Sequence, residues 1–304
     1  MEDYNRIIES LSVSFVKARN INILHPVTIE NNYDVENSLL LVNSGDIRFG
    51  LENKVVKKGE ILFLPGGKQE QITYGKGDAV QLSKDNFLNN KDRYFQSTSN
   101  DSFSDSSYSF VSFDSKVFDS VNFFASLDIP SFVLSENEKL NTLIHHINDE
   151  CFSNQPGRGR IIKSLTEQLV VELVRHFIQN RLFVEEFATN STYFKDPRLI
   201  DIFGYIKENL QNDLSNKVLA NVANVSEDYV GQYFKMLTGI NPQDYIEYQR
   251  MESAVNLLRT SKRSIREIGK EVGYKDTAYF CRRFKMMFGI PAGKMRRRES
   301  LMNL

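Results

Sequence analysis

Two similar segments lie about fifty residues apart in the last third of the chain, and they constrain its fold more than any other feature. The first runs from Leu219 to Pro242 and the second from Ile265 to Pro291. In each, a short helical pattern ends at a break (Asn224 or Gly273), a second helical pattern with aromatic anchors follows, and a Gly-Ile pair and a proline close the segment. Two short helices joined by a tight turn form a helix-turn-helix, whose second helix fits the major groove of DNA. The tandem arrangement therefore predicts a DNA-binding domain with two reading helices.

The charge of the chain is distributed unevenly along its length. The formal net charge is −1, but residues 1–195 carry 20 Lys and Arg against 26 Asp and Glu, whereas residues 196–304 carry 18 against 13. The two parts therefore have net charges of −6 and +5. A basic part joined to an acidic part is typical of a nucleic-acid-binding domain fused to another domain. A chain of 304 residues has room for two domains and a helical connector.

Other features indicate the compartment of the protein. The sequence has no apolar run of about 18 residues, and its start lacks the basic-then-apolar order of a signal peptide. The two cysteines, Cys151 and Cys281, are too few for a disulfide framework and fit a reducing environment. We therefore expect a cytoplasmic protein that does not contact a membrane.

Residues from about Ser12 to Val121 have the pattern of β-strands. Short segments rich in Leu, Ile, Val and Phe alternate with turn sequences, namely Ser38–Asn43, Asp46–Leu51 and Glu60–Pro65. A Ser- and Asp-rich loop is expected from Ser97 to Ser107, before another strand around Tyr108–Phe113. Strands at this spacing predict a small sandwich or barrel. The turn Gly75–Asp78 lacks the spacing of a phosphate loop and is expected to be a hairpin turn.

After Ser135, which is the expected N-cap, the period of the apolar residues changes from two to about 3.6. One helix is marked by Leu140, Leu143, Ile144, Ile147 and Cys151. A second is expected from about Ile161 to Asn180, with an apolar stripe of Leu165, Leu169, Leu173 and Phe177. Together they predict a helical hairpin that packs against the β domain, forms a dimerisation face, or does both. The likeliest place for a linker is Phe187–Asp196.

The expected organisation is an α+β multidomain chain. A β domain spans residues 1–134, the helical hairpin and linker span 135–195, and the double helix-turn-helix domain spans 196–304. Among the histidines of the hairpin, His145 and His146 are expected on a solvated helix face, and His176 beside the apolar stripe is expected to be structural.

Helical spacing separates the core side chains of the reading helices from the exposed ones. The expected core residues are Val230, Phe234 and Leu237 in the first helix, and Phe280, Phe284, Met287 and Phe288 in the second. The opposite faces then carry Asp228, Gly231, Gln232 and Lys235, and Ala278, Cys281, Arg282 and Lys285. Arg pairs with guanine, Gln pairs with adenine, and Ala or Cys fits a thymine methyl group. Arg282 is the best candidate for a base contact; the alternatives are a phosphate contact and a merely solvated arginine.

A connecting helix is predicted between the two segments, from Pro242 to about Thr260. Asn241 is a suitable N-cap and Pro242 suits the first helical position. At 1.5 Å per residue, this length spans roughly 28 Å. Successive major grooves on one face of DNA lie about 34 Å apart, so such a helix can hold the two reading helices in adjacent grooves.

The connecting helix and the second segment share one long pattern. Its residues are Pro242, Tyr245, Ile246, Arg250, Met251, Ala254, Leu257 and Leu258, followed by Ser264, Ile265, Ile268, Gly269, Val272, Gly273, Tyr274, Tyr279, Phe280, Phe284, Lys285, Phe288, Gly289, Ile290 and Pro291. This pattern closely resembles the signature of the AraC/XylS transcription regulators, and the resemblance covers roughly Ile200 to Arg297. Two positions depart from it, since Gly269 stands where Ala is usual and Met295-Arg296 stands where an aromatic residue and Arg are customary.

The resemblance implies a bipartite, seven-helix domain that recognises double-stranded promoter DNA. RNA polymerase is the expected protein partner, and activation is expected rather than repression. The base-reading positions of the family correspond to Asp228, Gly231, Gln232, Thr277, Ala278, Cys281 and Arg282. An acid and a glycine make the first helix a weak reader, so it is expected mainly to position the protein through Gln232 and Lys235. The residues expected on phosphates are Lys235, Lys262, Arg263, Lys275, Arg283 and Lys285.

The N-terminal domain resembles the cupin-like sensor of the same family more loosely, mainly through Val55–Ile72. That resemblance implies a domain that binds a small effector and forms a homodimer. The alternative is a domain that binds another protein, or only dimerises, and a filled core would favour this alternative. A metal-dependent cupin enzyme would need clustered His, Asp and Glu, but the β domain has one histidine, His25, so we expect no metal, cofactor or catalysis.

Overall fold

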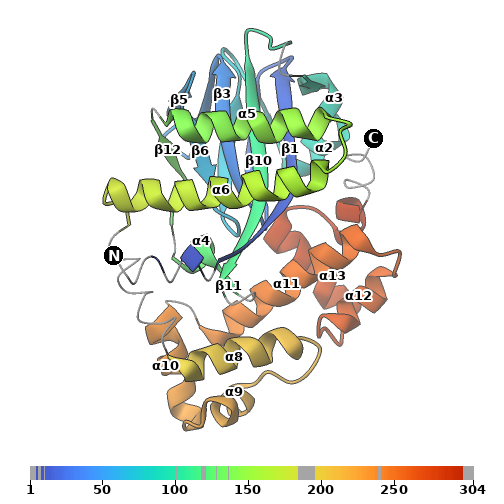
Figure 1. Cartoon of the computed structure of the whole chain (residues 1–304). Coiled ribbons are helices and arrows are strands. Elements are labelled where there is room, and N and C mark those ends of the chain that lie inside the picture. The colour runs from blue at the N-terminus through green and yellow to red at the C-terminus, as the bar shows by residue number, and fades with distance from the viewer. Residues whose placement is uncertain are drawn as a thin grey trace. The chain divides into compact units, whose positions relative to one another are not determined.

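The computed structural model describes residues 5, 8–9, 11–99, 102–117, 121–127, 129–135, 137–183, 196–238 and 241–296. They belong to two compact units, which we call the N-terminal unit (residues 8–117 and 122–183) and the C-terminal unit (residues 196–296). Figure 1 shows the sheets of the first unit with two long helices lying across them, and the helices of the second unit. Most of the expected linker Phe187–Asp196 lies outside the described residues. Within the described residues, no helix combines the length and hydrophobicity that a membrane span requires.

Two sheets form the N-terminal unit. The order of the larger sheet is β12-β6-β3-β10-β1-β9, with β11 beside β10, and that of the smaller is β5-β4-β7-β2-β8. Their strands are β1 (Leu11–Ile23), β2 (Val27–Tyr33), β3 (Asn37–Ser44), β4 (Asp46–Phe49), β5 (Lys54–Lys57), β6 (Ile61–Leu64), β7 (Gln69–Tyr74), β8 (Val80–Leu82), β9 (Phe95–Thr98), β10 (Ser107–Val117), β11 (Val121–Asn122) and β12 (Phe132–Leu134). The predicted strands are therefore confirmed. The loop predicted from Ser97 to Ser107 is shorter, because Ser97 and Thr98 belong to β9 and Ser107 begins β10; residues 100 and 101 lie outside the described residues. One turn was predicted wrongly: β8 pairs in parallel with β2 and not with β7, so Gly75–Asp78 does not close a hairpin.

The apolar run of β3 is continuous because both faces of this strand are covered. Leu40 and Val42 face a core shared with the smaller sheet. Leu39 and Leu41 alternate with them and are also buried, and Leu39 pairs with Phe63 of β6. Side chains from both sheets fill the shared core, together with Phe87 of α2 (Lys84–Asn89) and residues of α3 (Lys91–Tyr94).

The helical hairpin packs on the larger sheet. Figure 1 shows its two helices, α5 (Glu138–Phe152) and α6 (Arg158–Gln179), lying across the strands. The ring of Phe177 lies 6.1 Å from the rings of Phe63 and of Phe124 in α4 (Phe123–Ser126). The prediction that the stripe packs against the β domain is therefore confirmed. The N-cap was predicted wrongly: Asn137 caps α5 by accepting a hydrogen bond from the Leu140 amide, whereas the Ser135 hydroxyl donates to Glu60.

The described part of the C-terminal unit contains six helices, followed by a helical turn at residues 292–296, in agreement with the predicted seven-helix domain. They are α8 (Pro197–Glu208), α9 (Asn216–Ala223), α10 (Glu227–Thr238), α11 (Pro242–Thr260), α12 (Ile265–Glu271) and α13 (Thr277–Phe288). The first motif, α9 and α10, turns at Asn224, and the second motif, α12 and α13, turns at Gly273. Both turn residues have positive φ, which Asn and Gly tolerate best.

The connecting helix α11 belongs to both motifs. It has the 19 residues predicted for it, with Asn241 as N-cap residue and Pro242 in the first turn. Tyr245 and Ile246 enter the core of the first motif. Met251, Ala254 and Leu258 are buried further along the same helix, which packs against α12. The two motifs are therefore built on one continuous helix.

Candidate nucleic-acid interface

The first reading helix, α10, separates its side chains as expected. Val230 and Phe234 are fully buried, while Asp228, Gln232 and Lys235 are exposed and Gly231 is half-buried. Tyr233 is also buried, which the expected core pattern missed. The side chain of Leu237 lies outside the described residues. Glu227 and Asp228 in the first turn interact favourably with the helix dipole, but they present negative charge where DNA would approach.

The second reading helix, α13, presents a more basic surface. Phe280, Phe284 and Phe288 are buried and Met287 is half-buried. The candidate base contacts lie opposite: Ala278 and Arg282 are exposed, and Thr277 and Cys281 are half-buried. Asp276 caps the helix by accepting a hydrogen bond from the Tyr279 amide at 2.5 Å. The cap fixes the start of α13, the end that enters the groove in helix-turn-helix proteins.

Each reading helix also exposes a tyrosine and a methionine that the sequence reasoning missed. Tyr229 and Tyr279 are 44% and 48% exposed, and Met236 and Met286 are 63% and 65% exposed. In each helix the tyrosine lies three residues before the candidate reader, Gln232 or Arg282, and the methionine lies four residues after it. At this spacing the three side chains share one face of the helix. The Arg282 guanidinium lies 6.0 Å from the Tyr279 ring centroid, a cation–π arrangement that favours one position of the arginine. The same spacing of tyrosine and methionine in both reading helices was the sequence signal that could have identified these four residues.

The candidate phosphate contacts fall into two groups. Lys235, Lys262, Lys275 and Lys285 are exposed. In contrast, Arg263 pairs with Glu271, and Arg283 pairs through two nitrogens with Glu247 of α11. The hydrogen bonds that Arg283 donates to the Glu247 carboxylate raise the pKa of Arg283. Arg283 therefore holds α13 on α11 in this structure, a role that the sequence did not reveal.

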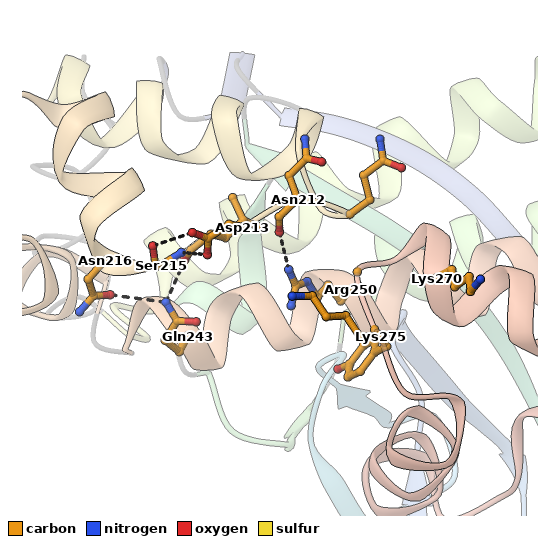
Figure 2. Close-up of a pocket in the computed structure, with 12 residues that line it drawn as sticks. Asn212, Asp213, Ser215, Asn216, Gln243, Arg250, Lys270 and Lys275 are labelled. Carbon is orange, nitrogen blue, oxygen red and sulfur yellow. Dashed lines mark hydrogen bonds between the residues drawn. The ribbon is translucent and has the colours of Figure 1, made fainter.

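A groove of about 1130 Å³ runs along α11 between the two motifs (Figure 2). The groove is lined by the loop before α9 and the start of α9, by α11, and by the end of α12 with the turn that follows it. The lining residues are Gln211, Asn212, Asp213, Leu214, Ser215, Asn216, Gln243, Arg250, Lys270, Gly273, Tyr274 and Lys275. Gln243 donates hydrogen bonds to Leu214 and Asn216, and Ser215 donates to Asp213. The groove thus joins the first motif to Lys275, one of the candidate phosphate contacts.

Elsewhere in the chain, the described residues contain no group of three His, Cys, Asp or Glu placed to hold a metal ion. His146 is exposed and His145 is half-buried near Phe103. His176 has the expected structural role, since its Nδ1 lies 3.0 Å from the amide nitrogen of Asn137, the N-cap of α5.

Comparisons with known proteins point to the C-terminal unit. A family described as "Helix-turn-helix domain" matches residues 219–298. An uncharacterized HTH-type transcriptional regulator of Haemophilus influenzae is 28% identical over 162 residues, 53% of each chain. The lactose operon transcription activator of Staphylococcus xylosus is 31% identical over 99 residues, 33% of this chain and 36% of the relative. The TetD protein of transposon Tn10 in Escherichia coli is 31% identical over 99 residues, which cover 33% of this chain and 72% of TetD. The chain therefore matches about half the length of the Haemophilus influenzae relative.

Solved structures of one protein resemble nearly the whole chain. ToxT from Vibrio cholerae O395 has a TM-score of 0.54 and 11% identity, and the match covers 96% of this chain and 99% of ToxT. At this identity the likeness concerns the fold alone. It joins an N-terminal domain of two sheets, linking helices and a C-terminal helix-turn-helix domain, as found here.

Proposed function

Because the chain belongs to the AraC/XylS family of DNA-binding transcription regulators, we propose that it activates transcription by placing α10 and α13 in two successive major grooves of promoter DNA. The observation that carries the proposal is the single 19-residue helix α11, on which both motifs are built. A relative named as a transcription activator supports activation, and RNA polymerase is the partner that this activity requires.

We assign the main base readout to α13. Arg282 reads a guanine, with Thr277, Ala278 and Cys281 beside it, because Arg282 is exposed and lies near Tyr279. Asp228 and Gln232 of α10 contribute weaker contacts. Lys235, Lys262, Lys275 and Lys285 supply phosphate contacts, each adding about 0.9 to the slope of log affinity against log salt. Arg263 and Arg283 are held by Glu271 and Glu247, so we assign them to the support of their helices.

For the N-terminal unit we propose dimerisation or binding of another protein, in preference to enclosure of a small effector between the sheets. The centre of this unit is filled by aromatic rings: Tyr74 and Phe95 lie 4.9 Å apart, Phe87 and Phe95 lie 5.0 Å apart, and Tyr74 and Tyr108 lie 5.3 Å apart. An effector site needs a hollow with converging polar groups. The packed rings therefore support the alternative in which no small effector enters this core.

Selection of bound duplexes from a random DNA pool tests the function. The purified full-length protein should enrich a two-part motif with halves about one helical turn apart. Enrichment by residues 196–304 but not by the full chain would show that the N-terminal unit restrains binding until a ligand or partner arrives. Failure of both proteins to enrich any sequence would contradict the proposal.

A further inference from the structure

One arginine at the middle of α11 connects the two motifs. Its Nε donates a hydrogen bond to the Leu210 carbonyl at 2.9 Å, and its Nη2 donates to the Asn212 carbonyl at 3.0 Å. Both carbonyls belong to the loop between α8 and α9. The same guanidinium of Arg250 lies 6.0 Å from the ring centroid of Tyr274, which follows the turn of the second motif. Figure 2 shows Arg250 between the Asn212 loop and the segment of Lys275.

The backbone of the second motif approaches this bridge as closely as glycine permits. Gly273 has a φ of +91°. A Cβ built on it would lie 2.3 Å from the Leu210 oxygen and 2.8 Å from the Arg250 Nε. The turn of the second motif, the loop that leads into the first motif and the connecting helix therefore meet at one point, where Arg250 donates hydrogen bonds to two carbonyls of that loop.

The chemistry of the bridge requires arginine. A guanidinium presents its donors in a rigid plane, so two of them can serve two carbonyls while the face of the plane stays near an aromatic ring. A lysine ammonium is a single point of charge and cannot fill both positions in that plane. Arg250 is half-buried, and burial lowers its pKa, as expected for a group partly withdrawn from water.

We propose that Arg250 is a positioning residue that fixes the distance and rotation between α10 and α13, and thereby the spacing of the two half-sites that the protein accepts. The inference rests on the proposed function, since it takes both helices to read the same DNA. Without the bridge, the second motif is attached through its packing on α11 and the Arg283–Glu247 pair, and it can tilt relative to the first. Tilting lowers the effective concentration of the second reading helix at its groove.

The test uses the full-length protein and the two-part site obtained by selection, with one or two base pairs inserted or removed between the halves. Dissociation constants are measured by fluorescence anisotropy for the wild type, Arg250→Lys and Arg250→Ala. The wild type should prefer one spacing. Both variants should bind the duplex with that spacing about tenfold more weakly than the wild type does, which corresponds to about 1.4 kcal/mol. For each variant, the dissociation constants for the different spacings should differ by less than about threefold. Binding to a duplex with one half-site should not change.

Each other outcome has a distinct meaning. If Arg250→Lys keeps the wild-type spacing preference, the bridge does not set the spacing and the inference is overturned. Equal weakening on all duplexes, single half-sites included, would make Arg250 a phosphate contact instead. Arg266→Ala, an exposed arginine on α12, is the matched control and should keep the preference. Arg250→Lys is the primary variant because it keeps the charge and stem, and thermal melting confirms its fold. If the wild type itself binds no two-part site, the proposed function fails rather than this inference.

Discussion

Arg282 and Gln232 occupy the same place in their helices, yet their neighbours differ. Each has an exposed tyrosine three residues before it, but the first turn of the helix that carries Arg282 has no acidic residue. Gln232 follows Glu227 and Asp228, whose charges oppose the approach of phosphates. At the scale of single residues, sequence discrimination should therefore be concentrated in α13.

Arg282→Ala should weaken binding to the selected site by roughly 1–3 kcal/mol and relax the preference at one base pair. The reason is the loss of a paired hydrogen bond to one base. Competition binding against single-base-pair variants of the site measures both effects. Lys285→Ala is the control: it should weaken all sequences alike and reduce the salt slope by about 1. Uniform weakening by Arg282→Ala would instead identify it as a phosphate contact.

His176 should make the N-terminal unit less stable at acidic pH. Its Nδ1 lies 3.0 and 3.3 Å from the side-chain amide nitrogens of Asn137 and Asn180. Since these nitrogens are donors, Nδ1 accepts their hydrogen bonds and the ring is neutral. Burial lowers the pKa of His176 in the folded chain. The unfolded chain therefore binds the proton more readily, and stability falls as pH drops below about 6.5.

Urea unfolding of the protein at pH 7.5 and 5.5 measures this loss. His176→Gln should reduce the loss of stability between pH 7.5 and 5.5. Part of the loss should remain, because burial also lowers the pKa of His145, although Asp149 raises it. Gln168→Ala, at an exposed position on α6 without a titratable side chain, should leave the pH dependence unchanged. A His176→Gln protein with the full wild-type dependence would contradict the assignment.

At the scale of elements, the two turns of the motifs use different residues for the same backbone conformation. Asn224 adopts a φ of 54° and Gly273 a φ of 91°. The second turn approaches the Leu210 carbonyl of the loop between α8 and α9 so closely that a Cβ at Gly273 would lie 2.3 Å from its oxygen. The glycine is therefore required by its surroundings as well as by its φ.

Gly273→Ala should destabilise the C-terminal unit by at least about 2 kcal/mol. A side chain at positive φ costs roughly 1–2 kcal/mol, and its Cβ would also displace the Leu210 carbonyl from Arg250. Thermal unfolding of the protein provides the measurement. Gly204→Ala, within α8 and with open space around its Cβ, should instead stabilise by about 0.5–1 kcal/mol. Equal effects of the two substitutions would show that the contact at Gly273 has no role.

The elements whose signals are local were predicted well from the sequence. Asn241 and Pro242 indicated the start of α11, and the short apolar segments bounded by turn sequences indicated β3, β4 and β6. Two errors came from competition between neighbours or from topology: Asn137 caps α5 in place of Ser135, and β8 crosses to pair with β2. The short helices α2, α3 and α4 were not predicted, since four to six residues carry little periodicity.

The candidate site was predicted in part. Helical spacing identified the exposed faces of α10 and α13. The pairs that hold the helices in place could not be predicted. Arg250 reaches carbonyls 40 and 38 residues away, and Arg283 reaches Glu247 36 residues away. Such pairs depend on tertiary packing, which spacing along the chain does not encode.

At the scale of the whole molecule, the helical hairpin buries one set of apolar side chains and exposes another. The apolar stripe of Leu169, Leu173 and Phe177 is buried within the N-terminal unit, so it is not available to a second copy of the chain. Phe152 at the end of α5 and Ile161 near the start of α6 are 51% and 49% exposed. If the hairpin mediates self-association, these residues are the candidates.

Residues 1–195 should therefore sediment as a dimer at micromolar concentration. Ile161→Glu should shift this fragment toward monomer, because burial of a charge at the contact is unfavourable. Lys163→Glu, an exposed neighbour on α6, controls for the added negative charge and should have a smaller effect. A wild-type fragment that sediments as a monomer would count against the hairpin as a dimerisation face.

The single-helix construction of α11 also limits how the recognised DNA can change over evolutionary time. One added residue lengthens a helix by 1.5 Å and turns it by about 100°, whereas one added base pair lengthens DNA by about 3.4 Å and turns it by about 35°. No single insertion in the protein can compensate for a single insertion in its target. Binding sites of this regulator should therefore diverge between related genomes by base substitution or by loss of whole sites, and only rarely by gain or loss of bases within a site.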